Sequence, residues 1–257
     1  MKQSQIAAQL YSFREFIRTP AGVRDTFRRL REIGYEAVQL SSSLAPMPEE
    51  ELAAMLAEAG LAAPTSHESA ASLIDQPEQV IEKLHKLQVK HTAYPFPHWR
   101  PTGRAEAVEL ARQLNGAARR YRDAGITLAY HNHSIEFERF EGRTMLELIY
   151  ENAPDLEAEL DTYWVQKGGA DPLAWIEKFP GRMQVLHIKD FGMKPHPECS
   201  GDVMKPVGEG NLDWNRLIPA AERCGVRWFV VEHDGDCADP FESFHSSFAY
   251  LKRNFVR

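Results

Sequence analysis

Cysteine is scarce in this sequence, with three residues among 257. Cys199, Cys224 and Cys237 cannot all pair with one another, and their spacing matches no zinc-binding pattern. We therefore expect no disulfide framework, and we interpret each cysteine as an ordinary buried or loop thiol. A reducing, cytoplasmic location fits this cysteine usage best.

Long apolar runs and an excess of positive charge are also missing. No run of 18 or more apolar residues occurs, so no membrane span is expected. The first residues, Met1–Gln5, lead into a strand-like run without the apolar segment of a secretory signal. The formal net charge is −7, which argues against nucleic acid as a partner because phosphate binding relies on lysine and arginine.

Short apolar strands and amphipathic helices alternate along the chain. The first helix is predicted to begin at Thr19 and Pro20, a cap followed by a proline, and to end at Gly34. Its apolar residues recur every three or four positions, as one buried helix face requires, at Val23, Phe27, Leu30 and Ile33. We count eight such strand-then-helix cycles, and the 43% of hydrophobic residues suffices for a sizeable core.

Eight alternating units predict a parallel sheet that closes on itself. A doubly wound open sheet is the alternative, but it normally has a glycine-rich phosphate turn after its first strand. The corresponding stretch here, Gln9–Arg14, contains no glycine. The sequence therefore predicts an α/β fold, a (β/α)8 TIM barrel, with residues 1–257 as a single domain.

Polar residues end several of the predicted strands. Gln39, His67, His131 and Glu232 each follow a helix-ending glycine by five to seven positions. Asp161 and His187 end strands of their own. In a (β/α)8 barrel the carboxyl ends of the strands carry the active site. These side chains are therefore expected to meet at one mouth of the barrel.

Acids and imidazoles that meet in this way are typical of a divalent metal site. We predict the ligand set Glu136, Asp161, His187 and Glu232, with His131 and His133 completing the site or binding substrate hydroxyls. Oxygen and imidazole ligands without thiolate suit Mn²⁺ or Mg²⁺, with Zn²⁺, Co²⁺ and Fe²⁺ as alternatives. Taken singly, each residue has a structural interpretation, as a hydrogen-bonded histidine or a helix-capping acid. Four of them at four strand ends are hard to explain as caps.

Further residues are candidates for substrate binding. Lys189 is expected on the same side of an extended segment as His187, so that it either reaches a substrate oxygen or pairs with Asp190. Trp164 would wall a sugar pocket, or simply pack. Glu209 lies in a predicted loop over the mouth, where a plain surface turn is the alternative. The acidic stretch 233–236 argues against a phosphorylated substrate.

The chain resembles the xylose isomerase-like TIM-barrel superfamily, in particular the group called sugar phosphate isomerases/epimerases. The resemblance extends over essentially the whole sequence. It rests on Gln9–Ser12, Tyr130–Phe137, Leu160–Trp164, His187–Asp190, Val207–Trp214 and Val231–Asp234. Together these motifs are specific for the superfamily, but they choose poorly among its reactions.

The resemblance implies a metal-dependent isomerase or epimerase of a sugar or keto-polyol, acting through an enediolate. Relatives of this kind bind metal through Glu, Asp, His and Glu, which match the predicted ligand set. The resemblance assigns Glu232 as base and Glu136 as acid, with His67 and Lys189 orienting hydroxyls. Because residues 136–141 read Glu-Phe-Glu-Arg-Phe-Glu, Glu138 is the alternative first ligand.

Two other functions stay open. The first is a metal-dependent dehydratase or lyase, because relatives with similar ligands are dehydratases of keto-cyclitols or dehydroshikimate. The second is a non-catalytic barrel that binds sugar without turnover. The DNA-repair endonuclease branch is disfavoured, because its three-zinc site needs more histidines and this chain is acidic. Substrate identity, the metal and the formation of a homo-oligomer are left open by the sequence.

Overall fold

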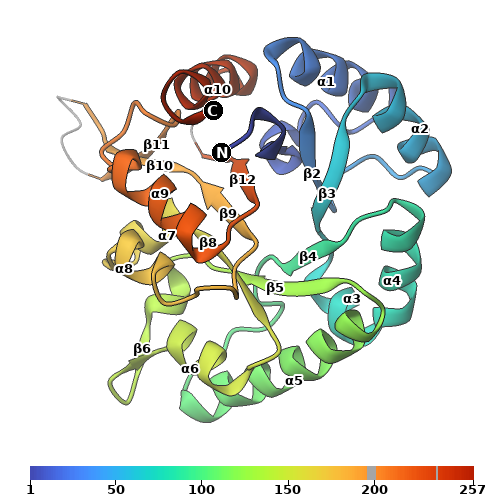
Figure 1. The fold of residues 1–257 in the computed structure, drawn as a ribbon. Helices are drawn as coiled ribbons and strands as arrows, with labels where there is room; N and C mark the ends of the chain where they lie inside the picture. The colour runs from blue at the N-terminus through green and yellow to red at the C-terminus, as the bar shows by residue number, and fades with distance from the viewer. Residues whose placement is uncertain (196–200, 236) are drawn as a thin grey trace.

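The computed structural model shows eight parallel strands that form a closed barrel, surrounded by helices (Figure 1). It describes residues 1–195, 201–235 and 237–257, so Cys199 and Asp236 lie outside the described residues. Strand β1 pairs with both β2 and β12, which closes the ring and confirms the predicted (β/α)8 barrel. The barrel strands are β1 (Ile6–Gln9), β2 (Ala37–Ser41), β3 (Ala62–His67), β4 (His91–Tyr94), β5 (Thr127–His131), β8 (Glu157–Asp161), β9 (Val185–Ile188) and β12 (Trp228–Val231).

Helices cover the outside of the barrel. They are α1 (Pro20–Ile33), α2 (Glu49–Ala59), α3 (Ala70–Asp75), α4 (Pro77–Lys86), α5 (Arg104–Asp123), α6 (Met145–Asn152), α7 (Thr162–Lys167), α8 (Pro172–Ile176), α9 (Trp214–Cys224) and α10 (Pro240–Phe255). Within the described ranges, no helix has both the length and the apolar composition needed to cross a membrane.

Short elements that the sequence did not predict flank the barrel strands, most of them in the loops at the carboxyl ends of the strands. Two antiparallel ribbons pair β6 (Arg139–Phe140) with β7 (Arg143–Thr144), and β10 (Asp190–Met193) with β11 (Asp202–Lys205). Three 3-10 turns are η1 (Gln3–Gln5), η2 (Leu10–Phe13) and η3 (Ile135–Phe137). The turn η3 decides where Glu136 lies.

Helix α1 begins and ends where the sequence predicts. The Thr19 hydroxyl accepts a hydrogen bond from the Gly22 backbone N–H at 3.1 Å, and Pro20 opens the helix. Gly34 ends it with φ of 123°, a conformation that favours glycine. A Cβ atom at this position would come within 2.6 Å of the Phe248 ring. Glycine is thus required both by the backbone and by the packing of α10 against α1.

The apolar core lies mainly between the sheet and the helices. A small separate cluster of Ala7, Ala37, Val185 and Val230 fills the inside of the barrel, with Trp228 packed against it. The rest of the interior is polar and fully or nearly fully buried. It is lined by Gln9, Gln39, Thr65, His91, His131, Glu159, Asp161 and His187. Burying so many polar groups is costly unless they are paired, so this polar interior indicates a functional site.

Candidate metal centre

Four neighbouring strands bring imidazoles and carboxylates to the mouth of the barrel. His131 and Asp161 are the last residues of β5 and β8, His187 lies in β9, and Glu232 directly follows β12. The strand register places Asp161 beside His187 and Val231 beside Ile188. Adjacent parallel strands in register therefore deliver these side chains to one level of the barrel.

These four residues, here called the mouth group, can surround a single ion. One ligand atom from each of His131, Asp161, His187 and Glu232 lies within 4.8 Å of the others, and all four residues are buried. His187 Nδ1 lies 2.9 Å from Glu232 Oε2, and His131 Nε2 lies 4.0 Å from Asp161 Oδ2. Two imidazoles and two carboxylates form a donor set that fits a divalent cation.

Three of the four predicted ligands belong to this group, and the fourth, Glu136, lies elsewhere. Its buried carboxylate accepts hydrogen bonds from the Tyr130 hydroxyl at 2.9 Å and from the His133 backbone N–H at 2.7 Å. The chain leaves β5 at His131 and turns through η3, which carries Glu136 beyond the strand end. His131 takes the fourth position instead. The alternative, Glu138, is 47% exposed and pairs with Arg100 at 2.9 Å.

Lys189 lies among the carboxylates at the mouth. Its Nζ is 3.1 Å from Asp161 Oδ2, 3.0 Å from Glu232 Oε2 and 3.0 Å from Asp234 Oδ1. Lys189 and His187 thus contact the same carboxylate, as expected from their spacing. A bound ion and Lys189 would share two carboxylates.

Asp190 does not pair with Lys189; it holds the following loop. Its carboxylate accepts hydrogen bonds from the backbone N–H groups of Gly208, Gly210 and Leu212 and from Trp214 Nε1 at 2.7 Å. The alternative reading of Lys189 as a partner of Asp190 is therefore wrong.

The protonation of the mouth group follows from burial and charge. Burial raises the pKa of Asp161 to about 6, although Lys189 and His187 act in the opposite direction. Burial also raises the pKa of Glu232, but Lys189 and His187 outweigh it and hold that pKa well below its ordinary value. For His187, burial lowers the pKa, while the carboxylates of Glu159 and Glu232 outweigh it and raise the pKa to about 10.

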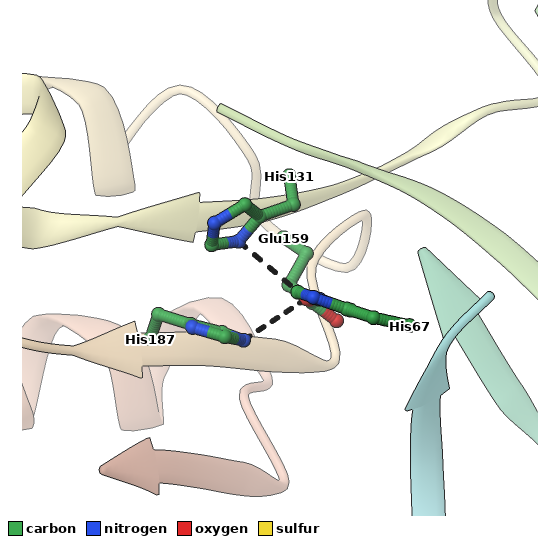
Figure 2. Close-up of side chains that lie close together, drawn as sticks. All are labelled: His67, His131, Glu159 and His187. Atoms are coloured by element: carbon green, nitrogen blue, oxygen red, sulfur yellow. Dashed lines mark hydrogen bonds and ion pairs between the residues drawn. The ribbon is translucent and has the colours of Figure 1, made fainter. Parts of the chain in front are cut away.

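A second group lies deeper in the barrel around Glu159, which the sequence analysis missed. Figure 2 shows the imidazoles of His67, His131 and His187 around its carboxylate, and Glu159 has no exposed surface. Its Oε1 lies 2.5 Å from His67 Nε2 and 3.1 Å from His187 Nε2. The signal was present in the sequence as Glu159 and Asp161 two positions apart in one strand, because such residues face the same side.

The mouth group opens into a cavity of about 280 Å³. Its lining includes His67, His131 and His133, which the sequence predicts to bind substrate. The rest of the lining comprises Tyr11, Ser41, Ser42, Pro95, Phe96, Glu232 and Asp234. A larger hollow of about 580 Å³ between α1 and α10 is lined by none of the clustered residues.

Two other predicted substrate residues lie beside this cavity or away from it. The Trp164 ring packs against His133 with 5.1 Å between ring centroids, and Lys189 Nζ lies 5.3 Å from the Trp164 centroid. Trp164 therefore supports cavity residues from behind. Glu209 accepts a hydrogen bond from the Ser246 hydroxyl on the exposed side of α10. This contact holds its carboxylate on the outer surface.

Comparison with known proteins identifies relatives of this chain. An inosose dehydratase of Clostridium beijerinckii is 23% identical over 164 residues, which cover 56% of this chain and 53% of that protein. The chain thus spans about half the length of the curated relative that it matches. A sugar phosphate isomerase/epimerase of Parabacteroides distasonis has a TM-score of 0.84 at 24% identity, covering 100% of this chain and 96% of that one.

A second solved structure is similar over nearly its whole length. It is a xylose isomerase-like TIM barrel protein of Mycobacterium smegmatis in complex with magnesium, with a TM-score of 0.72 at 17% identity. The match covers 97% of this chain and 95% of that one. Residues 27–254 also match a family model described as the xylose isomerase-like TIM barrel, and this protein belongs to that family.

Proposed function

We propose that this protein is a divalent-metal-dependent enzyme that moves a proton beside the carbonyl group of a sugar or keto-polyol, with isomerisation as the outcome. The observation that carries the proposal is the convergence of His131, Asp161, His187 and Glu232 beneath a cavity of about 280 Å³. The magnesium complex of the Mycobacterium smegmatis relative supports a hard divalent ion, Mg²⁺ or Mn²⁺.

The chain's own residues would divide the work as follows. His131, Asp161, His187 and Glu232 would hold a divalent ion, which when bound would polarise a substrate carbonyl and acidify the neighbouring C–H bond. Glu232 lines the cavity, and its carboxylate would take the proton, although Lys189 and His187 lower its pKa and so weaken it as a base. Lys189 does not line the cavity; its positive charge lies beside Glu232, where it would stabilise negative charge that develops near that carboxylate.

The carboxylates that line the cavity, Glu232 and Asp234, both follow strand β12 and so lie on one side, which favours isomerisation over epimerisation. Inverting a carbon centre calls for a proton to leave one face of the substrate and return to the other, which two groups on opposite faces achieve. Glu136, the acid expected from the resemblance, is hydrogen-bonded to Tyr130 and does not line the cavity. Glu232 alone can remove a proton and return it to the adjacent carbon on the same face.

Dehydration is the second candidate. The inosose dehydratase of Clostridium beijerinckii supports it, and water loss begins with the same proton abstraction. The further requirement is an acid beside the departing hydroxyl group. His67 lines the cavity, and its Nε2 lies 2.5 Å from Glu159. This imidazole is placed to supply that proton.

The cavity favours a neutral substrate. Among the described residues that line it there is no lysine or arginine, whereas Glu232 and Asp234 are acidic. Tyr11 and Phe96 are 42% and 49% exposed and offer apolar faces to a sugar or cyclitol ring. Phosphate esters would meet like charge here, so we expect free sugars or keto-polyols to be preferred.

The test follows the proton in deuterated solvent. The purified protein is incubated with Mn²⁺ and a panel of ketoses and keto-cyclitols in D₂O, and the products are analysed by proton NMR. We expect deuterium at the carbon beside the carbonyl. A new aldose signal marks isomerisation, whereas an ultraviolet-absorbing enone marks dehydration.

Variants separate chemistry from binding. Because Glu232 also belongs to the mouth group, each variant is assayed at saturating Mn²⁺, and Glu232→Gln should then reduce deuterium uptake by at least about 10²-fold. Glu177→Gln, an exposed residue at the end of α8, should behave as wild type. If no substrate takes up deuterium while metal and sugar still bind, the protein is a non-catalytic binding barrel and not an enzyme. Undiminished exchange in Glu232→Gln would remove this residue as the base.

A further inference from the structure

Glu159 occupies a position that the proposed chemistry does not use. It lies in β8 two residues before Asp161, does not line the cavity, and has no exposed surface. Both of its oxygens receive close polar contacts. Gln39 Nε2 donates to them at 3.2 and 3.3 Å, which fixes the plane of the carboxylate from the side of β2.

The two imidazoles of the mouth group each face Glu159 with one nitrogen. His187 Nε2 lies 3.1 Å from Glu159 Oε1, and His131 Nδ1 lies 3.6 Å from the same oxygen (Figure 2). The opposite nitrogens point to the mouth group. His187 Nδ1 lies 2.9 Å from Glu232, and His131 Nε2 lies 4.0 Å from Asp161.

This arrangement has a chemical consequence for metal binding. A neutral imidazole carries one N–H and one lone pair, and a metal ion binds the lone pair. A carboxylate behind the ring accepts the N–H and leaves the other nitrogen free to coordinate. Glu159 Oε1 lies within ion-pair distance of the rear nitrogen of both rings, and neither nitrogen makes a hydrogen bond to any described residue. Strand pairing places Glu159, on β8, beside His131 on β5.

We propose that Glu159 is a positioning residue that selects the tautomer and the orientation of both His131 and His187 for metal binding. The inference rests on the proposed metal site. It makes an asymmetric assignment: His187 would carry its hydrogen on Nε2 and bind through Nδ1, whereas His131 would carry its hydrogen on Nδ1 and bind through Nε2.

His67 gives the same carboxylate a connection to the cavity. Its Nε2 lies 2.5 Å from Glu159 Oε1, and its ring stacks on His187 with 5.1 Å between centroids and 5° between planes. His67 also lines the cavity. Glu159, which lies behind His131 and His187, therefore also contacts a residue that a bound substrate would touch.

The test uses Glu159→Gln, which keeps the shape of the side chain and replaces one acceptor oxygen with an N–H donor. The matched control is Glu157→Gln, two residues earlier in the same strand, where the side chain accepts from Gln184. We expect Mn²⁺ titrated calorimetrically to bind Glu159→Gln about 10- to 100-fold more weakly than wild type. Glu157→Gln should bind as wild type does.

A second readout reports the rings directly. Long-range ¹H–¹⁵N NMR of the Mg²⁺-loaded wild type should show the Nε2–H form for His187 and the Nδ1–H form for His131. In Glu159→Gln at saturating Mg²⁺, at least one of these forms should change or become a mixture. A general loss of structure would instead broaden signals across the barrel and would appear in thermal unfolding.

The outcomes separate this inference from the proposed function. If wild type binds Mn²⁺ and Glu159→Gln binds it equally well with unchanged tautomers, the positioning role is overturned and the metal site stands. If both rings carry their hydrogen on the same nitrogen, the assignment is wrong. Two ions per chain, one lost in Glu159→Gln, would make Glu159 a ligand. Absence of metal binding in wild type would overturn the inference and the proposed metal site together.

Discussion

The side chains of His131 and Glu136 leave the same strand end in different directions. His131 is the last residue of β5 and points into the barrel, where its Nε2 lies 4.0 Å from Asp161. Glu136 follows on η3 and bonds the Tyr130 hydroxyl and the His133 backbone. Whether a side chain can reach the mouth group depends on the direction in which it leaves the backbone. The turn between His131 and Glu136 sets that direction.

The two residues should respond differently to truncation. His131→Ala removes a nitrogen of the mouth group, so we expect Mn²⁺ to bind at least about tenfold more weakly. Glu136→Ala removes two buried hydrogen bonds and should cost about 1–3 kcal/mol of stability while metal affinity stays within a few fold. Isothermal titration calorimetry and urea unfolding measure the two effects. The reverse order of metal affinities would restore Glu136 as the ligand.

The carboxyl group of Glu136 should also make stability depend on pH. Burial raises its pKa to about 7, although hydrogen bonds from His133 and Tyr130 oppose the change. A carboxyl group with a raised pKa stabilises the fold while it is protonated, so its contribution is present at pH 4.5 and is lost as pH rises through about 7. The difference between this pKa and the ordinary value of 4.5 corresponds to roughly 3 kcal/mol in the free energy of unfolding.

The experiment compares wild type with Glu136→Gln, whose neutral amide does not titrate. Urea unfolding between pH 4.5 and 8 should show wild type losing stability relative to the variant as pH rises. Any pH-independent difference in stability between the acid and the amide side chain cancels, because only the change of stability with pH is compared. Parallel curves would mean that Glu136 has an ordinary pKa in the folded protein.

At the scale of elements, strand β8 shows what sequence patterns can and cannot predict. Asp161 was predicted because it ends a strand, and strand ends are visible as the boundary of an apolar run. Glu159 was not, because the prediction considered only the residues that end strands, although its spacing of two positions from Asp161 already placed both side chains on one face of the strand. The structure places it opposite His131, facing the barrel interior. Glu136 lies outside the mouth group because the chain turns through η3 after β5, and so short a turn leaves little sequence signal.

The loop after β11 is organised by Asp190. Its carboxylate accepts hydrogen bonds from four backbone N–H groups, including that of Phe191, and from Trp214 Nε1, and a Cβ atom on Gly210 would approach its Oδ1 to 2.3 Å. Asp190→Asn replaces one acceptor oxygen with a donor that faces N–H groups. We expect about 2–4 kcal/mol of destabilisation.

The Asp190 prediction is checked by urea unfolding, with Asp213→Asn as control, since no side-chain cap hydrogen bond is made by Asp213 at α9. Metal affinity should change little, because Asp190 lies outside the mouth group. Equal stability of Asp190→Asn and wild type would show that the loop is held by its backbone alone.

At the scale of the whole molecule, the barrel followed from the sequence because its signal repeats. Helix starts such as Thr19 with Pro20, and helix ends such as Gly34 and Gly60, recur between apolar strands and confirm one another. The short helix α7 and the β10–β11 ribbon had no such support, since each occurs once and is brief. Global topology was predictable, and local insertions at the carboxyl ends were not.

A metal ion held by the mouth group should stabilise the entire barrel. Its ligands come from β5, β8, β9 and the end of β12, so an ion binds the folded ring and has no preformed site in the unfolded chain. At a free concentration 100 times the dissociation constant, such binding adds about 2.7 kcal/mol to the free energy of unfolding. Chelation should remove this increment from wild type, and Mn²⁺ should restore it. His187→Ala should gain less from Mn²⁺ than wild type, because a tenfold weaker site adds only about 1.4 kcal/mol at the same free concentration, whereas Glu177→Gln should follow wild type. An undiminished increment in His187→Ala would place the ion elsewhere, because the loss of one of four ligands must weaken binding and so reduce the stability that binding adds.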